Sequence, residues 1–79
     1  MEAESNHIVY SVPAVMCQHC RRAIEGAVGV IDGVESVSVD LDEKTVDVRF
    51  VAGRADPDAV RQAIEGEGYE VAGERFAGG

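Results

Sequence analysis

The sequence predicts a small α+β sandwich whose elements follow one another as strand, helix, strand, strand, helix, strand. Two neighbouring stretches alternate apolar and polar residues, and two others carry apolar residues at helical spacing. A short repeat is the third observation, because residues 22–26 (RAIEG) and 62–66 (QAIEG) differ only at their first position. The repeat falls on the same part of both predicted helices, which indicates two related halves.

The strands are predicted from their period of two. Residues 35–41 (ESVSVDL) and 45–50 (TVDVRF) place apolar side chains on one face and polar side chains on the other. This pattern is typical of strands covered on one side only, and the short polar link between them makes a hairpin. Residues 7–12, rich in β-branched and aromatic side chains, predict another strand, and residues 69–76 a further one that Gly73 weakens.

The helices are predicted from apolar stripes and capping residues. Ile24, Val28 and Ile31 recur at spacings of four and three, so they line one face of the first helix. The second helix is expected to begin with Asp56 as its N-cap and Pro57 as its first residue. Its apolar residues are again spaced three and four apart, and glycines end it.

Interleaving two such halves gives a four-stranded antiparallel sheet with both helices on one face, the ferredoxin-like βαββαβ arrangement. The two halves differ at their helix entrances. Aligning the repeats places Cys17 on Pro57 and Cys20 on Val60. One helix therefore begins with ordinary capping residues and the other with two thiols, which indicates a role for the thiols beyond capping.

Composition limits the class of protein. The 79 residues suffice for one domain, and the net charge of −8 makes nucleic acid and anionic membranes poor partners. No apolar run approaches the ~18–20 residues that a membrane span requires, so we expect no membrane insertion. The first residues lack a basic segment followed by an apolar stretch, which predicts a cytoplasmic protein with reduced thiols.

Both cysteines of the chain lie in residues 17–20 (CQHC), at the predicted start of the first helix. The unpaired N–H groups of a helix start, together with the helix dipole, favour thiolate over thiol. Arg21 and Arg22 add positive charge nearby, although Arg21 is also placed to pair with Glu25 one turn along the helix.

Three chemistries compete for this pair. A structural zinc site needs four ligands, and His7 and His19 are poorly arranged to complete a tetrahedron with the cysteines. Dithiol redox chemistry fits a C-x-x-C motif at a helix start, but a thioredoxin-like fold normally needs a longer chain. Cu(I) prefers sulfur and accepts few ligands, so Cys17 and Cys20 suit it. An ion held by two thiolates on an exposed loop stays open to attack by a partner's thiolates.

At these residues the chain resembles the heavy-metal-associated domain, whose loop reads Gly-Met-x-Cys-x-x-Cys between the first strand and the first helix. It is most like the free-standing bacterial copper chaperones. The resemblance runs from about His7 to Ala72 and rests on CQHC, DGVESVSVDLDEKTVDVRF and AIEGEGYEV. It implies a single heavy-metal-associated domain over residues 1–79, with a core at about 7–74.

The resemblance also implies roles for the residues around the thiols. Ala14 and Val15 stand where the family has Gly-Met, so we expect Val15 to fill part of the methionine's space beneath a slightly looser or repositioned loop. Met16 is expected to pack the loop or be exposed, with contact between its thioether and the ion as the alternative. His19 is expected to point away along the helix, with a third ligand as the alternative. Tyr69 matches a family position beside the cysteines, where its hydroxyl can donate to the thiolates while its ring closes the core.

The function that the resemblance implies is a carrier, not an enzyme. Cys17 and Cys20 would bind Cu(I) and deliver it by thiolate exchange to a copper-transporting P-type ATPase, or to that pump's N-terminal metal-binding domain. Copper would also be able to bridge two copies into a homodimer.

Two alternatives to the copper carrier stay open. One is the same fold carrying Zn(II), Cd(II) or Hg(II), and the other is a small dithiol oxidoreductase. Relatives selective for divalent ions often carry a carboxylate next to the first cysteine. Val15 and Met16 offer none there, which favours a soft monovalent ion.

Overall fold

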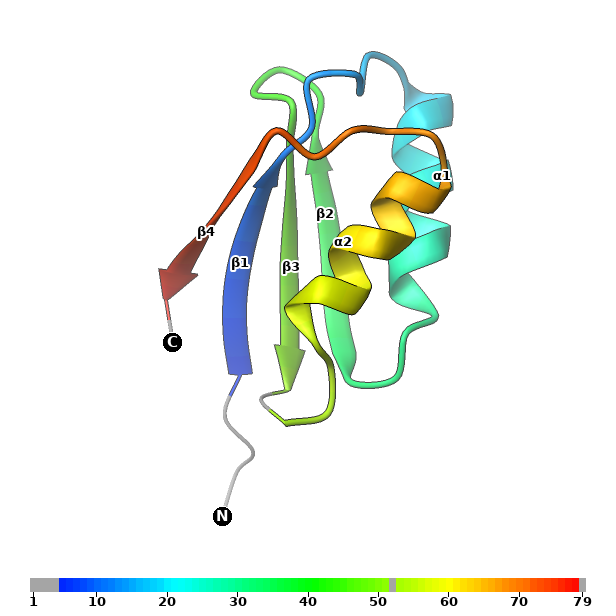
Figure 1. Ribbon diagram of the computed structural model, residues 1–79. Helices are drawn as coiled ribbons and strands as arrows, with labels where there is room; N and C mark the ends of the chain where they lie inside the picture. The colour runs from blue at the N-terminus through cyan, green and yellow to red at the C-terminus, as the bar shows by residue number, and fades with distance from the viewer. Residues whose placement is uncertain (1–4, 52, 79) are drawn as a thin grey trace.

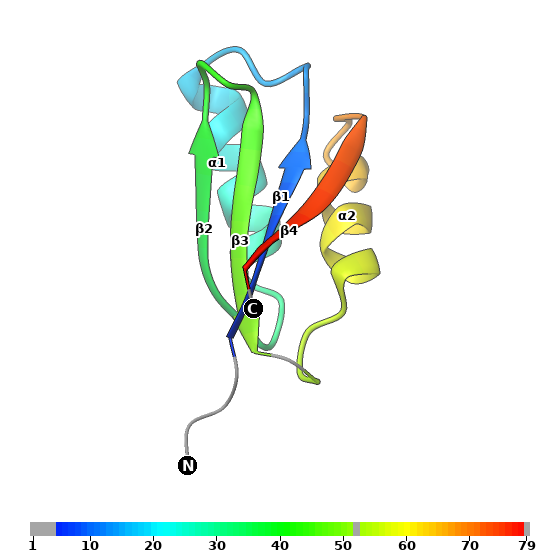
Figure 2. The same cartoon turned by 90° about the vertical axis from the view of Figure 1, so that its left-hand side faces the viewer.

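A computed structural model of the chain describes residues 5–51 and 53–78. The elements follow the predicted order: β1 (Ser5–Ser11), α1 (Gln18–Gly29), β2 (Val34–Asp40), β3 (Thr45–Val51), α2 (Pro57–Gly66) and β4 (Gly73–Gly78). The strands form an antiparallel sheet in the order β2-β3-β1-β4. Both helices cover one face of this sheet and leave the other uncovered (Figures 1 and 2). The predicted ferredoxin-like arrangement is confirmed.

The core lies between the sheet and the two helices, as the alternating pattern predicted. On β3, the side chains of Val46, Val48 and Phe50 are all buried. Three other elements add fully buried residues, namely Ile8 and Tyr10 from β1, Ile24 and Val28 from α1, and Val60 and Ile64 from α2. The Tyr10 hydroxyl donates to the Pro57 carbonyl oxygen at 2.8 Å, which ties β1 to the first residue of α2.

The two helices begin differently, as the comparison of the repeats predicted. The side chain of Asp56 caps α2 by accepting a hydrogen bond from the main-chain N–H of Asp58 at 3.0 Å. Cys17 is the N-cap residue of α1, with an extended backbone and no side-chain capping bond. Its sulfur is therefore not committed to holding the helix start.

The predicted boundaries of the first and last strands were wrong by one to four residues. The first strand is Ser5–Ser11 instead of 7–12, and the last begins at Gly73 instead of 69. Tyr69 and Val71 do alternate with exposed neighbours, but a strand needs a partner backbone, and β1 ends at Ser11, opposite Gly73. Gly73 consequently opens the strand and does not weaken it.

The register of β1 on β3 decides which loops meet. Ser11 at the end of β1 pairs with Thr45 at the start of β3. The β1–α1 loop, the β2–β3 turn and the segment between α2 and β4 therefore gather at one end of the sandwich, opposite the start of β1 and the end of β4 (Figure 1). Neither α1 nor α2 has the length and the apolar run that crossing a bilayer requires.

Candidate metal centre

The two thiols meet where the β1–α1 loop enters α1. Their sulfur atoms are 3.6 Å apart, well beyond the about 2.05 Å of a disulfide, so both cysteines are free. Cys17 is exposed, while Cys20 is half-buried and packs against the core. Two sulfurs this close on the surface can bind one ion together or oxidise to a disulfide.

Four hydrogen-bond donors surround the Cys20 sulfur. The Tyr69 hydroxyl lowers the pKa of Cys20 most, followed by the main-chain N–H of Met16 and then by the thiol and main-chain N–H of Cys17. Together they lower the pKa of Cys20 from its ordinary 9.0 to about 7, against a smaller opposing effect of burial. Thiolate is therefore much more accessible at neutral pH than for an ordinary cysteine.

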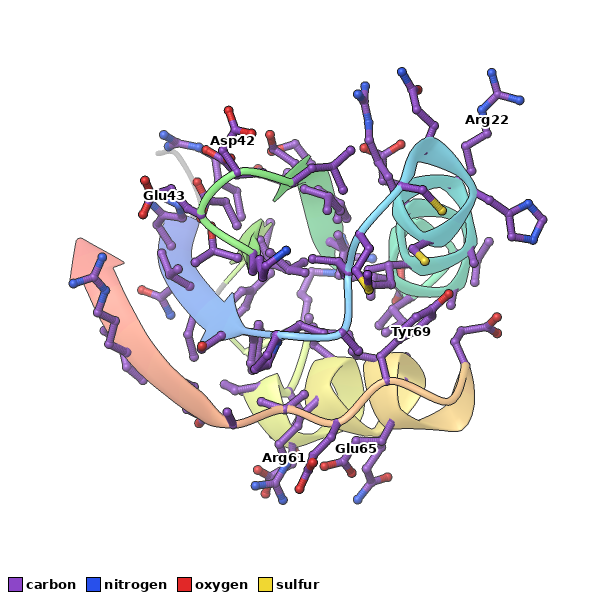
Figure 3. The ribbon with its side chains drawn as sticks, turned by 90° about the horizontal axis from the view of Figure 1, so that it is seen from above. Arg22, Asp42, Glu43, Arg61, Glu65 and Tyr69 are labelled. Atoms are coloured by element: carbon purple, nitrogen blue, oxygen red, sulfur yellow. The ribbon has the colours of Figure 1, made fainter. Side chains whose placement is uncertain are left out.

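Tyr69 joins the site from the segment that follows α2. Figure 3 shows its side chain extending from this segment toward α1. Its hydrogen bond to Cys20 raises the pKa of Tyr69, because the bond stabilises the protonated phenol next to a thiolate. The ring is half-buried and packs against the core. One residue thus contacts both the core and the sulfur.

Replacing Tyr69 with phenylalanine removes the donor with the largest effect on the pKa of Cys20, so that pKa should rise. We expect alkylation of Cys20 at pH 7 to slow about two- to threefold, since the loss of thiolate outweighs the higher nucleophilicity of the thiolate that remains. Iodoacetamide rates followed against pH by mass spectrometry measure this. Tyr10→Phe is the matched control, because it removes a hydroxyl bonded to Pro57 instead. If the pH at the midpoint of the alkylation curve were the same in Tyr69→Phe as in the unmodified protein, the hydrogen bond from Tyr69 to Cys20 would be contradicted.

The loop before Cys17 is held by a buried valine. Val15 is 0% exposed and belongs to the core, so it occupies the packing position expected for the family methionine. Met16 is 73% exposed, which matches the expectation of an exposed side chain. His19 is exposed on the first turn of α1, and Arg21 pairs with Glu25 through a 3.2 Å bond.

Sequence reasoning missed Lys44, which it treated only as part of a polar link. The Lys44 carbonyl accepts from the Val12 N–H at 2.9 Å, and its ammonium donates to the Val15 carbonyl at 3.4 Å. The signal that could have found it is topological: the first strand ends at the edge where the third begins, so the hairpin turn must lie beside the cysteine loop.

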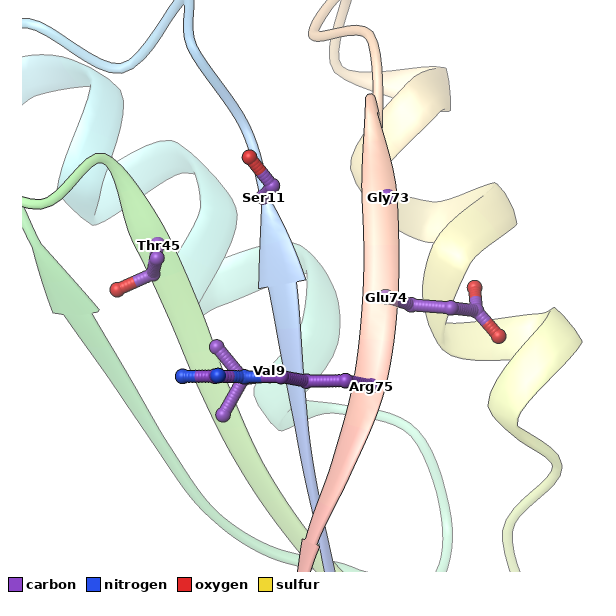
Figure 4. Close-up of a pocket in the computed structure, with 6 residues that line it drawn as sticks. All are labelled: Val9, Ser11, Thr45, Gly73, Glu74 and Arg75. Carbon is purple, nitrogen blue, oxygen red and sulfur yellow. The ribbon is translucent and has the colours of Figure 1, made fainter.

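The structure offers no competing centre in the part of the chain that it describes. No three or more His, Cys, Asp or Glu residues cluster there in a way that could hold a metal ion. His7 lies on β1 with its Nε2 3.8 Å from the Asp47 carboxylate, so its nearest charged partner is not at the thiol pair. A shallow depression of about 240 Å³ between β1, β3 and β4 is lined by residues such as Val9 and Arg75 and contains no cysteine (Figure 4).

Comparisons with known proteins agree with this geometry. A family model described as the heavy-metal-associated domain matches residues 9–70. The copper chaperone CopZ of Bacillus subtilis (strain 168) is 44% identical over 61 residues, which is 77% of this chain and 88% of that protein. A solved structure described as the CopZ metallochaperone superposes with a TM-score of 0.81 at 33% identity, covering 84% of this chain and 98% of the other.

A third match is a copper binding domain from HMA7, a P-type ATPase, with a TM-score of 0.78 at 25% identity over 90% of this chain and 92% of that one. Fold and thiol pair together define the class: a small βαββαβ module with an exposed C-x-x-C loop. The chain belongs to the heavy-metal-associated domain family, and it is similar to proteins named copper chaperones.

Proposed function

We propose that the protein is a cytoplasmic Cu(I) chaperone whose ligands are Cys17 and Cys20. The observation that carries this proposal is the pair of free sulfurs 3.6 Å apart at an exposed helix start. The hydrogen bonds that lower the pKa of Cys20 to about 7 support it. Soft thiolates select Cu(I), and two ligands are enough for it. Similarity to proteins named copper chaperones supports the choice of copper.

Delivery follows from the low number of ligands. A thiolate of the recipient forms a third Cu–S bond, the bond to Cys17 or Cys20 then breaks, and the freed sulfur takes up a proton from water. The second bond is exchanged in the same way. Copper stays Cu(I) throughout, so no electron acceptor is needed, and the protein acts as a carrier and not as an enzyme.

The recipient that we propose is the soluble metal-binding domain of a copper-transporting P-type ATPase. The copper binding domain of one such ATPase shares this fold, so two similar thiol loops would face each other across the ion. The same geometry, with a second copy in place of the ATPase domain, would give a copper-bridged homodimer.

A competition titration tests the choice of ion. The reduced protein should bind Cu(I) one-to-one against a chelator of known affinity, and a large excess of Zn(II) should not displace it, because the site lacks the four ligands that zinc prefers. Zn(II) binding of comparable strength would favour the divalent carrier instead. Turnover of a disulfide substrate by the same sample would favour the oxidoreductase.

A further inference from the structure

The backbone conformation at Lys44 is one that lysine rarely adopts. Its φ of 58° lies in the left-handed region, which glycine and asparagine adopt more readily. The turn is set up upstream, because the Asp40 carboxylate accepts hydrogen bonds from the N–H groups of Asp42 and Glu43 at 2.9 and 3.0 Å. Any reason for a lysine at this point must come from its side chain.

That side chain reaches the peptide group that joins Val15 to Met16. The Lys44 ammonium donates to the Val15 carbonyl oxygen, at 3.4 Å. The N–H of the same peptide group belongs to Met16 and donates to the Cys20 sulfur. Because the peptide is trans, its C=O and N–H point in opposite directions. A single rigid group therefore has the Lys44 ammonium at one end and the Cys20 sulfur at the other.

We propose that Lys44 is a positioning residue for the metal centre, acting through the Val15–Met16 peptide group on the Cys20 sulfur. A charge-assisted bond to a carbonyl withdraws electron density and makes the N–H of that amide a better donor. The lysine thereby strengthens the N–H···S bond and holds the loop in the form that receives metal. Its main-chain carbonyl restrains the start of the same loop by accepting from Val12 at 2.9 Å.

This inference rests on the proposed function only for its effect on copper, since the hydrogen-bond chain is present without metal. The test compares Lys44→Met, which removes the charge and the donor, with Lys44→Arg, which keeps both. Arg75→Met is the matched control, because it removes one positive charge from an exposed position on β4, on the uncovered face of the sheet (Figure 4). Circular dichroism checks that each variant is folded, and Lys44→Gln replaces Lys44→Met if the latter is not.

The first readout is the amide proton shift of Met16 in the reduced, metal-free protein, measured by ¹H–¹⁵N NMR. It should move upfield in Lys44→Met, as expected for a weaker hydrogen bond, and should stay near its original position in Lys44→Arg and Arg75→Met. The second readout is Cu(I) affinity by chelator competition. The affinity should fall about three- to tenfold in Lys44→Met. This is no more than the smallest loss, about tenfold, that is typical when a group hydrogen-bonded to a metal ligand is removed.

Each alternative outcome overturns the inference. If neither the Met16 amide shift nor the Cu(I) affinity changed in Lys44→Met, Lys44 would have no effect on the Cys20 sulfur through the Val15–Met16 peptide group. If Lys44→Arg lost as much Cu(I) affinity as Lys44→Met, the positive charge of Lys44 would not be the cause of the effect. If Arg75→Met lost as much, the effect would come from the net charge of the protein and not from the position of Lys44. If the unmodified protein binds no Cu(I), the proposed function is wrong. The Met16 amide shift, measured without metal, still tests whether Lys44 strengthens the hydrogen bond to Cys20.

Discussion

A variant in which serine replaces both Cys17 and Cys20 is expected to lose one-to-one Cu(I) binding and keep its fold. Serine hydroxyls are hard, protonated donors at neutral pH, so they offer the soft ion nothing comparable to thiolate. The affinity should fall by much more than the ~10–100-fold that loss of a group outside the ligand set costs. The fold should persist because Cys17 is exposed and Cys20 only borders the core. Chelator competition and circular dichroism measure the two effects.

Met16→Leu is the matched control for this variant. It removes a neighbouring sulfur whose side chain is 73% exposed, while leaving both thiols in place. Its stoichiometry and affinity for Cu(I) should equal those of the unmodified protein. Undiminished one-to-one binding in the double serine variant would place the site elsewhere, and a loss in Met16→Leu would make the thioether a ligand.

Alanine at Gly33 should produce a large loss of stability for so small a change. Gly33 has a φ of 97°, and a Cβ there would lie 2.7 Å from the main-chain carbon of Arg54 and 2.8 Å from the nitrogen of Ala55. The backbone conformation and the clash each cost about 1–2 kcal/mol, so the free energy of unfolding should fall by about 2–4 kcal/mol. Urea unfolding of the metal-free, reduced protein measures this.

Gly26→Ala provides the comparison within the same chain. Gly26 lies inside α1, and a Cβ there meets nothing within 4 Å. Alanine should therefore raise the free energy of unfolding by about 0.5–1 kcal/mol, because it restricts the unfolded chain and favours the helix. If both variants unfold at the same urea concentration, the close approach of Gly33 to the β3–α2 connection is not a constraint on the fold.

Most of the fold could be predicted because its elements follow local rules. Alternation on β3 marked Val46, Val48 and Phe50 as buried, and the Asp56–Pro57 pair marked the start of α2. The end of a strand is different, because it depends on where the partner strand stops. That is why residues 69–72 alternated like a strand and yet were not part of one.

The residues of the candidate site also differ in whether the local sequence could predict them. The spacing of Cys17 and Cys20 at a helix start pointed to the thiol pair, since residues three apart on a helix lie on one face. The resemblance placed Tyr69 beside them, a position that neither composition nor periodicity reveals. Lys44 was not found at all, because its contact with the loop depends on the pairing of β1 with β3 and on a turn whose side chains cannot be oriented from their order.

Periodicity and motif spacing were sufficient for the βαββαβ order, the buried faces and the pair of thiols, because each depends on residues only a few positions apart. The surroundings of the Cys20 sulfur were not accessible in this way. Its donors come from two separate segments, the β1–α1 loop and the segment after α2. Only the packing of the sheet brings that second segment and the β2–β3 turn to the entrance of α1. The lowered pKa of Cys20 therefore depends on the tertiary structure, although the presence of the thiol pair could be predicted from the sequence.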